Sequence, residues 1–114
     1  MKAPWKNLAA SILGLILSKA YFLVPFKKCA ANEYWLAYRH PKPVYPVHFL
    51  ILPRRPWKNV FEIPAEDPGS AAALLQIASA LIRKEKLEQE PCRLVINGGA
   101  FQTAPLVHVH LISG

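Results

Sequence analysis

Paired cysteines and charged residues are both scarce in this sequence. Only two cysteines are present, Cys29 and Cys92, and neither belongs to a CxxC motif. The sequence therefore predicts neither a zinc site nor a disulfide framework. Reduced thiols in an intracellular chain are the plainer interpretation. A single disulfide bond remains the alternative if the chain is exported. Charged residues make up only 18% of the chain and apolar residues 53%, which excludes intrinsic disorder because disordered chains combine low hydrophobicity with high net charge.

Acidic residues are nearly missing from the first half of the chain. Residues 1–60 contain ten Lys and Arg but one acid, Glu33, for a net charge of +9, whereas residues 61–114 have a net charge of −2. The basic half suits an anion or a membrane surface as its partner. The whole chain has 114 residues and no internal repeat, so it has room for one compact domain and excludes a large multidomain enzyme.

The longest apolar run, residues 8–26, has lysines on both sides. A signal peptide, a membrane span and a helix docked on the domain are each compatible with it. Small or weakly polar residues recur along it at spacings of three and four, which favours a helix over an extended segment. We therefore predict an apolar helix within residues 1–28, docked or membrane-associated, followed by a folded unit at residues 29–114.

Beyond residue 28 the pattern changes to short strands. The segments Glu33–Tyr38 and Val47–Leu52 are rich in aromatic and β-branched residues, which predicts two strands. Three prolines lie between them, Pro41, Pro43 and Pro46. They exclude a helix or a central strand and predict an ordered turn.

A helix is predicted to start at Asp67 and Pro68, where a capping side chain precedes a residue whose missing N–H is not needed. Apolar residues then recur at helical spacing and predict one face packed on the sheet: Ala71, Leu74, Leu75, Ala78, Leu81 and Ile82. The helix should run to about Leu87, with its charged end solvated.

Two more strands are predicted at Arg93–Asn97 and Leu106–Ile112, joined by a turn around Gly98 and Gly99. The order of elements is then helix, two strands, helix, two strands. This order predicts the α+β class, with an antiparallel sheet, a packed helix and an extra apolar helix at the N-terminus.

Two histidines in the last predicted strand, His108 and His110, carry the strongest chemical signal. The period of two along a strand places both on one face. Neutral imidazole can act as a metal ligand, a proton carrier or a nucleophile near pH 7, and two partly exposed histidines without a role are the plain alternative. A metal site would need a third ligand, for which His48 is a candidate, but no carboxylate cluster supports it.

Further motifs lie around these histidines in a specific order. Residues 33–55, EYWLAYRHPKPVYPVHFLILPRR, contain an apolar strand, a proline-bearing turn, a histidine and an apolar strand ending in Pro and Arg. Asn97, two glycines, Gln102 and Thr103 then precede the histidine strand. This arrangement resembles the histidine triad (HIT) family of nucleotide-binding hydrolases and transferases, whose hallmark is a His-x-His-x-His strand. The resemblance covers residues 33–114 and implies a HIT-like fold.

The resemblance also implies roles in catalysis. His108 matches the middle histidine, the family's nucleophile, and His110 matches the third, which helps to hold the phosphate. His48 matches a histidine that lines the same site. Gln102 and Thr103 match polar residues that contact the scissile phosphate or the leaving group. The implied reaction is attack on an α-phosphate to give a nucleotidyl-histidine that water hydrolyses, and it requires no metal or other cofactor.

Other positions either match residues that contact the nucleotide in the family or depart from the family pattern. Asn97 matches a nucleotide-contacting asparagine. His40 occupies a turn position where many members carry an acid for the ribose. Leu106 stands where the first histidine of the triad usually is, and Pro56 replaces a later histidine. A nucleotide hydrolase or transferase is the first hypothesis, and a non-catalytic nucleotide-binding protein of the same fold is the alternative.

The expected partner is a small nucleotide. No nucleic-acid-binding motif is present, and Arg54 and Arg55 either attract a phosphate or form a solvated strand end. The apolar helix and the edge of the sheet predict a homodimer. We expect a cytoplasmic protein, with a membrane tether through residues 8–26 left open.

Overall fold

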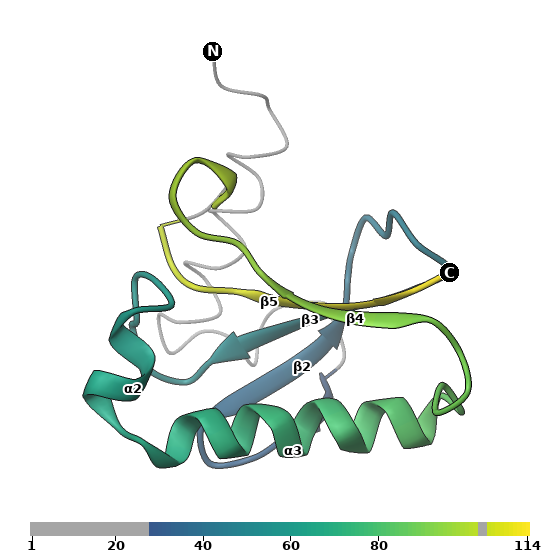
Figure 1. The fold of residues 1–114 in the computed structure, drawn as a ribbon, viewed down its shortest axis with the longest axis horizontal. Coiled ribbons are helices and arrows are strands. Elements are labelled where there is room, and N and C mark those ends of the chain that lie inside the picture. The colour runs from purple at the N-terminus through teal and green to yellow at the C-terminus, as the bar shows by residue number, and fades with distance from the viewer. Residues whose placement is uncertain (1–27, 103–104) are drawn as a thin grey trace.

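In the computed structural model, the described residues 28–102 and 105–114 form one antiparallel sheet with a long helix against one face (Figure 1). The strands are β1 (Lys28–Ala31), β2 (Trp35–Arg39), β3 (Val47–Pro53), β4 (Cys92–Ile96) and β5 (Val109–Ser113). The helices are α2 (Glu62–Glu66), α3 (Gly69–Lys84) and a 3-10 turn, η3 (Gly99–Phe101). The strand order is β1-β2-β3-β5-β4 and every neighbouring pair is antiparallel. The predicted α+β class is confirmed.

The predicted apolar helix at residues 8–26 lies outside the described residues. Among the described residues, no helix combines the length and the apolar character that crossing a bilayer requires.

All four predicted strands are present, with shifted ends, and β1 is an addition. The start of β2 moves from Glu33 to Trp35 because the Asn32 side chain accepts hydrogen bonds from the amides of Tyr34 and Trp35 and holds the chain in a turn. The sequence of β1, KCAA, has no alternation and little β-propensity, so only its pairing with β2 reveals it as a strand.

The last strand also starts later than predicted, at Val109 rather than Leu106. The amide of Val107 donates a hydrogen bond to the carbonyl of Trp57 at 3.0 Å, outside the ladder of the sheet. His108 therefore lies immediately before β5, while His110 lies within it.

Helix α3 begins at Gly69, one residue after Pro68, and the Asp67 side chain accepts a hydrogen bond from the Gly69 amide. The helix ends at Lys84 rather than Leu87 because Lys86 adopts a φ of 58°. The amides of Lys86 and Leu87 donate to the carbonyls of Arg83 and Ile82, which is a Schellman motif without its usual glycine.

The buried face of α3 is rotated from the predicted one. Ala71 and Leu75 were expected against the sheet but are exposed, Leu75 by 60%. The face that packs on the sheet is a stripe with spacings of three, four and seven: Ser70, Ala73, Leu74, Ile77, Ala78 and Leu81.

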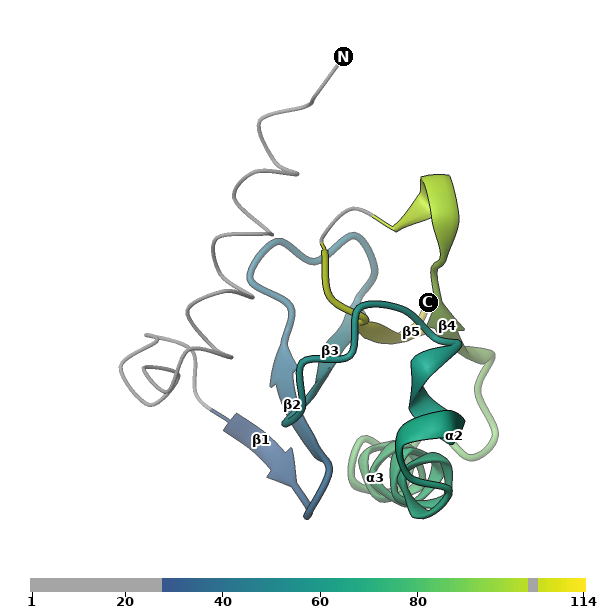
Figure 2. The same cartoon turned by 90° about the vertical axis from the view of Figure 1, so that its left-hand side faces the viewer.

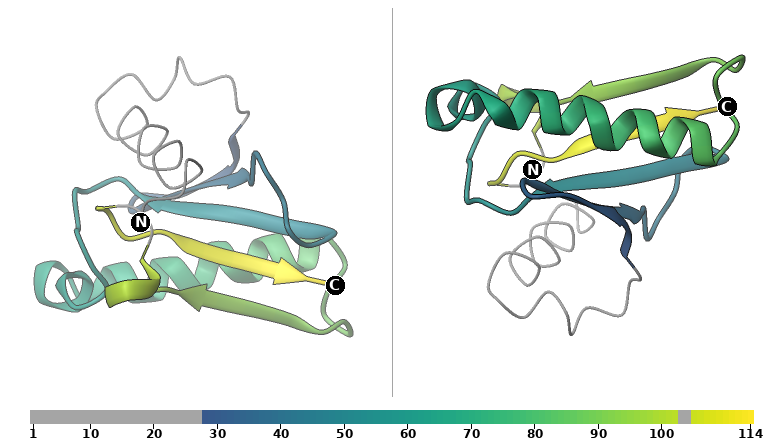
Figure 3. Two further views of the ribbon diagram at one scale, coloured as in Figure 1. Left: turned by 90° about the horizontal axis from the view of Figure 1, so that it is seen from above. Right: turned by 90° about the horizontal axis from the view of Figure 1, so that it is seen from below.

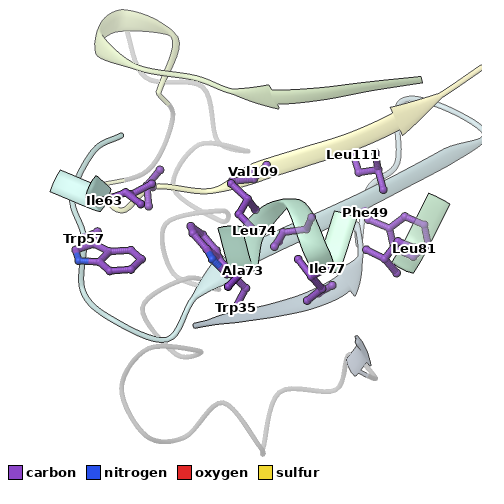
Figure 4. Packing of buried hydrophobic residues seen from close by; sticks show 13 residues of the cluster. Trp35, Phe49, Trp57, Ile63, Ala73, Leu74, Ile77, Leu81, Val109 and Leu111 are labelled. Atoms are coloured by element: carbon purple, nitrogen blue, oxygen red, sulfur yellow. The ribbon is translucent and has the colours of Figure 1, made fainter. Parts of the chain in front are cut away.

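The core lies between this stripe and the inner face of the sheet (Figure 4). Large side chains of β2, β3 and β5 meet Leu74, Ile77 and Leu81 of the helix. The indole of Trp35 donates a hydrogen bond to the Ser70 carbonyl at 2.9 Å, which ties β2 to the first turn of α3. Trp57 packs beside Trp35, with ring centroids 5.7 Å apart.

The other face of the sheet is not covered by α2 or α3 (Figure 3). Because side chains alternate along a strand, Val109 and Leu111 join the core while His110 points to the opposite face. The loop that joins β2 to β3 stands on that opposite side of the sheet from α3 (Figures 1 and 2). This arrangement places the loop beside the predicted site.

Candidate functional site

The four histidines of the chain gather on the face of the sheet away from α3. His48 lies on β3, His110 lies on β5, His108 precedes β5 and His40 follows β2. The ring centroids of His48 and His110 are 5.2 Å apart, and so are those of His108 and His110. His48 pairs with Ile112 across the sheet and Leu50 pairs with His110, so the two imidazoles are diagonal neighbours on one face.

The ring of His108 is buried, with 5% of its surface exposed. Its Nδ1 lies 3.0 Å from the carbonyl oxygen of Leu106. A carbonyl can only accept, so Nδ1 carries the proton, and in the neutral ring Nε2 carries the lone pair. Burial lowers the pKa of His108, although the hydrogen bond to Leu106 opposes the shift. His108 is therefore a neutral base with its lone pair on Nε2.

His48 is fixed by a hydrogen bond to the backbone. The amide of Val44 donates to Nδ1 of His48 at 3.1 Å, and Nε2 of His48 lies 3.0 Å from Nδ1 of His110. Burial lowers the pKa of His48. Burial, followed by the charges that neighbouring histidines would carry, lowers the pKa of His110 to about 4. Both rings are neutral at pH 7.

His40 stacks on His48, with centroids 4.3 Å apart and planes inclined by 28°. The amide of Lys42 donates to its Nδ1 at 3.0 Å. Burial, followed by repulsion from His48 and His108, lowers the pKa of His40 to about 4. The structure thus brings His40 into the same cluster as the histidines of the sheet.

A metal ion is one conceivable ligand of this cluster, because one ring nitrogen from each of His40, His48 and His110 lies within 4.8 Å of the others. The backbone amides of Lys42 and Val44 occupy the Nδ1 lone pairs of His40 and His48. The protons of these two neutral rings are therefore on Nε2, where a metal would need lone pairs. The cluster fits hydrogen bonding to an anion better than coordination of a cation.

An open cavity of about 380 Å³ adjoins His48 and His110, within the size range of small-molecule sites. It is lined by Val44, Tyr45, His48, Arg93, Val95, Asn97, His110 and Ile112. Three of these residues, His48, Asn97 and His110, were predicted for the site. Arg93 and Val95 were missed, although the period of two from Asn97 back along β4 places them on the same face.

Two predicted site residues, Gln102 and Thr103, belong to the segment between β4 and β5. The side chain of Gln102 donates a hydrogen bond to the Lys58 carbonyl at 2.6 Å. Thr103 lies outside the described residues.

The arginines after β3 lie at the opposite end of that strand from His48. Arg54 donates to the Asn32 carbonyl at 2.7 Å, and the guanidinium of Arg55 lies 4.4 Å from the ring centroid of Tyr34. Both side chains are thus engaged in packing and hydrogen bonding at that end, which favours the structural interpretation over phosphate attraction.

Together, the fold and the site define a class of small α+β proteins. Members of this class have a helix on one face of an antiparallel sheet and histidines from two adjacent strands on the other. The family model described as the HIT domain matches residues 23–114 of this chain. An uncharacterized HIT-like protein of Synechococcus elongatus is 33% identical over 106 residues, which cover 91% of this chain and 90% of that protein. The chain belongs to the HIT family.

Two other similar proteins have more informative descriptions. A purine nucleoside phosphoramidase of Escherichia coli is 28% identical over 82 residues, covering 68% of this chain and 67% of that enzyme. The structure of a HIT family hydrolase from Clostridium thermocellum superimposes with a TM-score of 0.78 and 25% identity, covering 92% of this chain and 90% of that one.

Proposed function

We propose that this protein is a nucleotide hydrolase or nucleotidyl transferase that acts at an α-phosphate through a covalent intermediate on His108. The observation that carries the proposal is the hydrogen bond between Nδ1 of His108 and the Leu106 carbonyl, because it leaves the Nε2 lone pair as the nucleophile. The lowered pKa of His108 supports the same role, since a protonated ring has no lone pair to donate.

In the first step, Nε2 of His108 forms a bond to the α-phosphorus, and the bond from phosphorus to the leaving group breaks. The leaving group departs with that bond's electron pair and takes up a proton. In the second step, the oxygen of water forms a bond to the phosphorus and the Nε2–phosphorus bond breaks. One proton of the water is released, and Nε2 recovers its lone pair together with a free nucleoside monophosphate.

The surrounding residues would bind the nucleotide and stabilise charge. His110 would donate a hydrogen bond to a phosphoryl oxygen, which stabilises the charge that develops there. His48 lines the site beside it, and Asn97 and His40 would contact the nucleoside. Gln102 and Thr103 keep their predicted role near the leaving group as part of this proposal.

A non-catalytic nucleotide-binding protein is the second candidate. Leu106 stands in place of the first histidine of the triad, and a site that depended on that histidine would bind nucleotide without turnover. In the structure, Leu106 supplies its carbonyl to His108, and any residue at position 106 would supply the same group. This favours catalysis.

The test uses an adenylate joined to an amine through a phosphoramidate bond. We expect release of adenosine monophosphate, and a rapid quench should trap an adenylyl adduct that intact-mass and peptide analysis locate at His108. The variant His108→Ala is the control, with binding measured by calorimetry. Binding by the wild-type protein without release or adduct would establish the second candidate instead.

A homodimer is part of the proposal. β4 ends the described sheet, and its free edge could pair with the same strand of a second copy. Sedimentation equilibrium of the full chain should give twice the chain mass of 12.8 kDa, and a mass equal to one chain would contradict it.

The proposed location is the cytoplasm. Cell fractionation distinguishes whether residues 8–26 form a docked helix or a membrane anchor. A docked helix predicts that the full chain is recovered without detergent and that residues 28–114 alone aggregate. An anchor predicts that the full chain sediments with membranes and that the same fragment is released and folded. The fragment starts at Lys28 because β1 begins there.

A further inference from the structure

The loop between β2 and β3 contains the pattern HPKPVYPVH, residues 40–48, whose prolines the proposed reaction does not use. Its two ends are joined, because the amide of His40 donates to the carbonyl of His48 at 2.8 Å. Each proline fixes its own φ and restricts the residue before it. The prolines also lack amide donors. The loop is therefore stiff, and two of its remaining amides, those of Lys42 and Val44, donate to histidine rings.

This loop holds the ring of His48 from three directions. The Val44 amide donates to Nδ1, the ring of His40 stacks on one face at 4.3 Å, and the ring of Tyr45 approaches at 5.8 Å with an interplanar angle of 71°. Only 7% of the surface of His48 is exposed. A flip of the His48 ring would break the hydrogen bond from the Val44 amide and disturb the packing of the ring.

The direction of these hydrogen bonds places each proton. A backbone amide can only donate, so Nδ1 of His48 has no proton and the neutral ring carries its proton on Nε2. That N–H points to Nδ1 of His110 at 3.0 Å and donates to it. Nδ1 of His110 therefore accepts, and the neutral ring of His110 carries its proton on Nε2.

We propose that His48 is a positioning residue that keeps His110 as an Nε2–H donor. The hydrogen bond from the Val44 amide fixes the tautomer of His48, and the tautomer of His48 in turn fixes that of His110. This deepens the proposed function and rests on it for its catalytic consequence, which is a neutral donor aimed at a phosphoryl oxygen. With the other tautomer, His110 would present a lone pair, which repels an anionic oxygen. The Val44 amide of the loop thus determines, through two successive hydrogen bonds, that His110 offers a donor to an anionic ligand.

Nuclear magnetic resonance of the full-length wild-type protein tests the proton positions without any turnover. In ¹⁵N-labelled protein we expect the ring shifts of His110 to show a bare Nδ1 and a protonated Nε2, and those of His48 to show the same. A scalar coupling across the N–H···N bond between the two rings should be detectable. A protonated Nδ1 on His110, or mixed tautomers, would overturn the proposal.

A titration with zinc in the same spectra examines the competing occupant. The proposal expects the ring shifts of His48 and His110 to stay unchanged at equimolar zinc, because both rings present protons or engaged lone pairs to the cluster. Loss of the proton between the two rings at equimolar zinc would assign the cluster to a metal and refute the proposal.

Two substitutions separate proton placement from loop anchoring. The amide nitrogen of Gln reaches the position of Nε2, so His48→Gln retains a donor to His110. The side chain of Asn reaches only the position of Nδ1, so His48→Asn retains the contact with Val44 and loses the donor. We expect kcat of His48→Asn to fall by roughly 10- to 100-fold, as for partners that orient metal-bound imidazoles, with KM little changed. His48→Gln should stay within about threefold of wild type.

The opposite order, with Asn active and Gln inactive, would show that His48 serves only to anchor the loop. Equal loss in both variants would overturn the proposal in the same way, provided that heteronuclear spectra show both to be folded. If the wild-type protein shows the expected tautomers but no turnover, the proposed function fails and the assignment of the proton positions stands.

Discussion

At the scale of single residues, the properties of this site depend on which nitrogen of each imidazole carries the proton. His108 and His110 are two residues apart on one chain segment, yet their Nδ1 atoms have opposite roles. Nδ1 of His108 donates to a carbonyl, whereas Nδ1 of His110 faces the N–H of His48. One ring is left with a lone pair at Nε2 and the other with a donor. In the proposed reaction, the lone pair attacks the phosphorus and the donor stabilises charge on a phosphoryl oxygen.

The first prediction concerns these two side chains. His108→Ala should abolish covalent labelling by an adenylate, because no other Nε2 lone pair is fixed at that position. His110→Ala should lower the rate by about 100-fold, which is typical of losing one charge-stabilising donor. Rapid-quench mass spectrometry and steady-state rates measure the two effects. An unchanged rate in His108→Ala would refute the mechanism.

The second prediction concerns Leu106, which the resemblance to the family places at the first histidine of the triad. Leu106→His keeps the backbone carbonyl that holds His108 and restores the polar side chain. We expect turnover to rise and nucleotide affinity to stay nearly the same, measured by rates and calorimetry, with Leu106→Asn as the control for polarity alone. A variant that unfolds would show that the half-buried Leu106 side chain is needed for packing.

At the scale of elements, the site depends on how β2, β3 and β5 are held against α3. The indole of Trp35 connects β2 to the first turn of α3 through the Ser70 carbonyl, and this hydrogen bond is buried. Trp57 offers a natural comparison. It is as buried as Trp35, but its indole nitrogen has no hydrogen-bond partner among the described residues.

The third prediction compares Trp35→Phe with Trp57→Phe. Both changes shrink a buried aromatic ring, but only the first removes a hydrogen bond, the one from the indole to the Ser70 carbonyl. Trp35→Phe should therefore lower the free energy of unfolding by about 1 to 2 kcal/mol more than Trp57→Phe does. Urea unfolding followed by circular dichroism measures both values. Equal losses would show that the indole hydrogen bond contributes nothing to stability.

At the scale of the whole molecule, four neutral histidines gathered on one face make stability depend on pH. Their folded pKa values all lie below the ordinary value of 6.5, with His40 and His110 at about 4. Between pH 6.5 and these lower pKa values, the histidines of the unfolded chain bind protons that those of the folded protein do not bind. The stability that the neutral histidines contribute is therefore fully present above pH 6.5 and is lost as the pH falls toward 4.

The fourth prediction is a fall in the free energy of unfolding between pH 7 and pH 5, measured by urea titration at several pH values. Histidine is the side chain whose ordinary pKa lies within this window. His40→Gln should make the slope shallower, since one of the shifted groups is removed. A free energy of unfolding that is constant or rises over this window would contradict the neutral state of the cluster.

Much of the fold was predictable from local chemistry. The apolar, β-prone run of β3, the alternation in β5, the start of α3 after Asp67 and Pro68, and the α+β class all follow from patterns within a few residues. The errors lie where local signals are weak. β1 has no alternation, and the end of α3 at Lys86 uses a left-handed residue that is not glycine.

The sequence by itself determined the chemistry available to this protein: two histidines of one segment on one face, a third on another apolar strand, and a stiff loop between two strands. Only the tertiary structure decided which nitrogens hold the protons. The amide of Val44 and the carbonyl of Leu106 act on His48 and His108 through backbone hydrogen bonds. His48 meets His110 across 62 residues of sequence because β3 and β5 are neighbours. The directions of these backbone groups and the pairing of β3 with β5 follow from the packing of the whole chain. The identities of the histidines alone do not determine them.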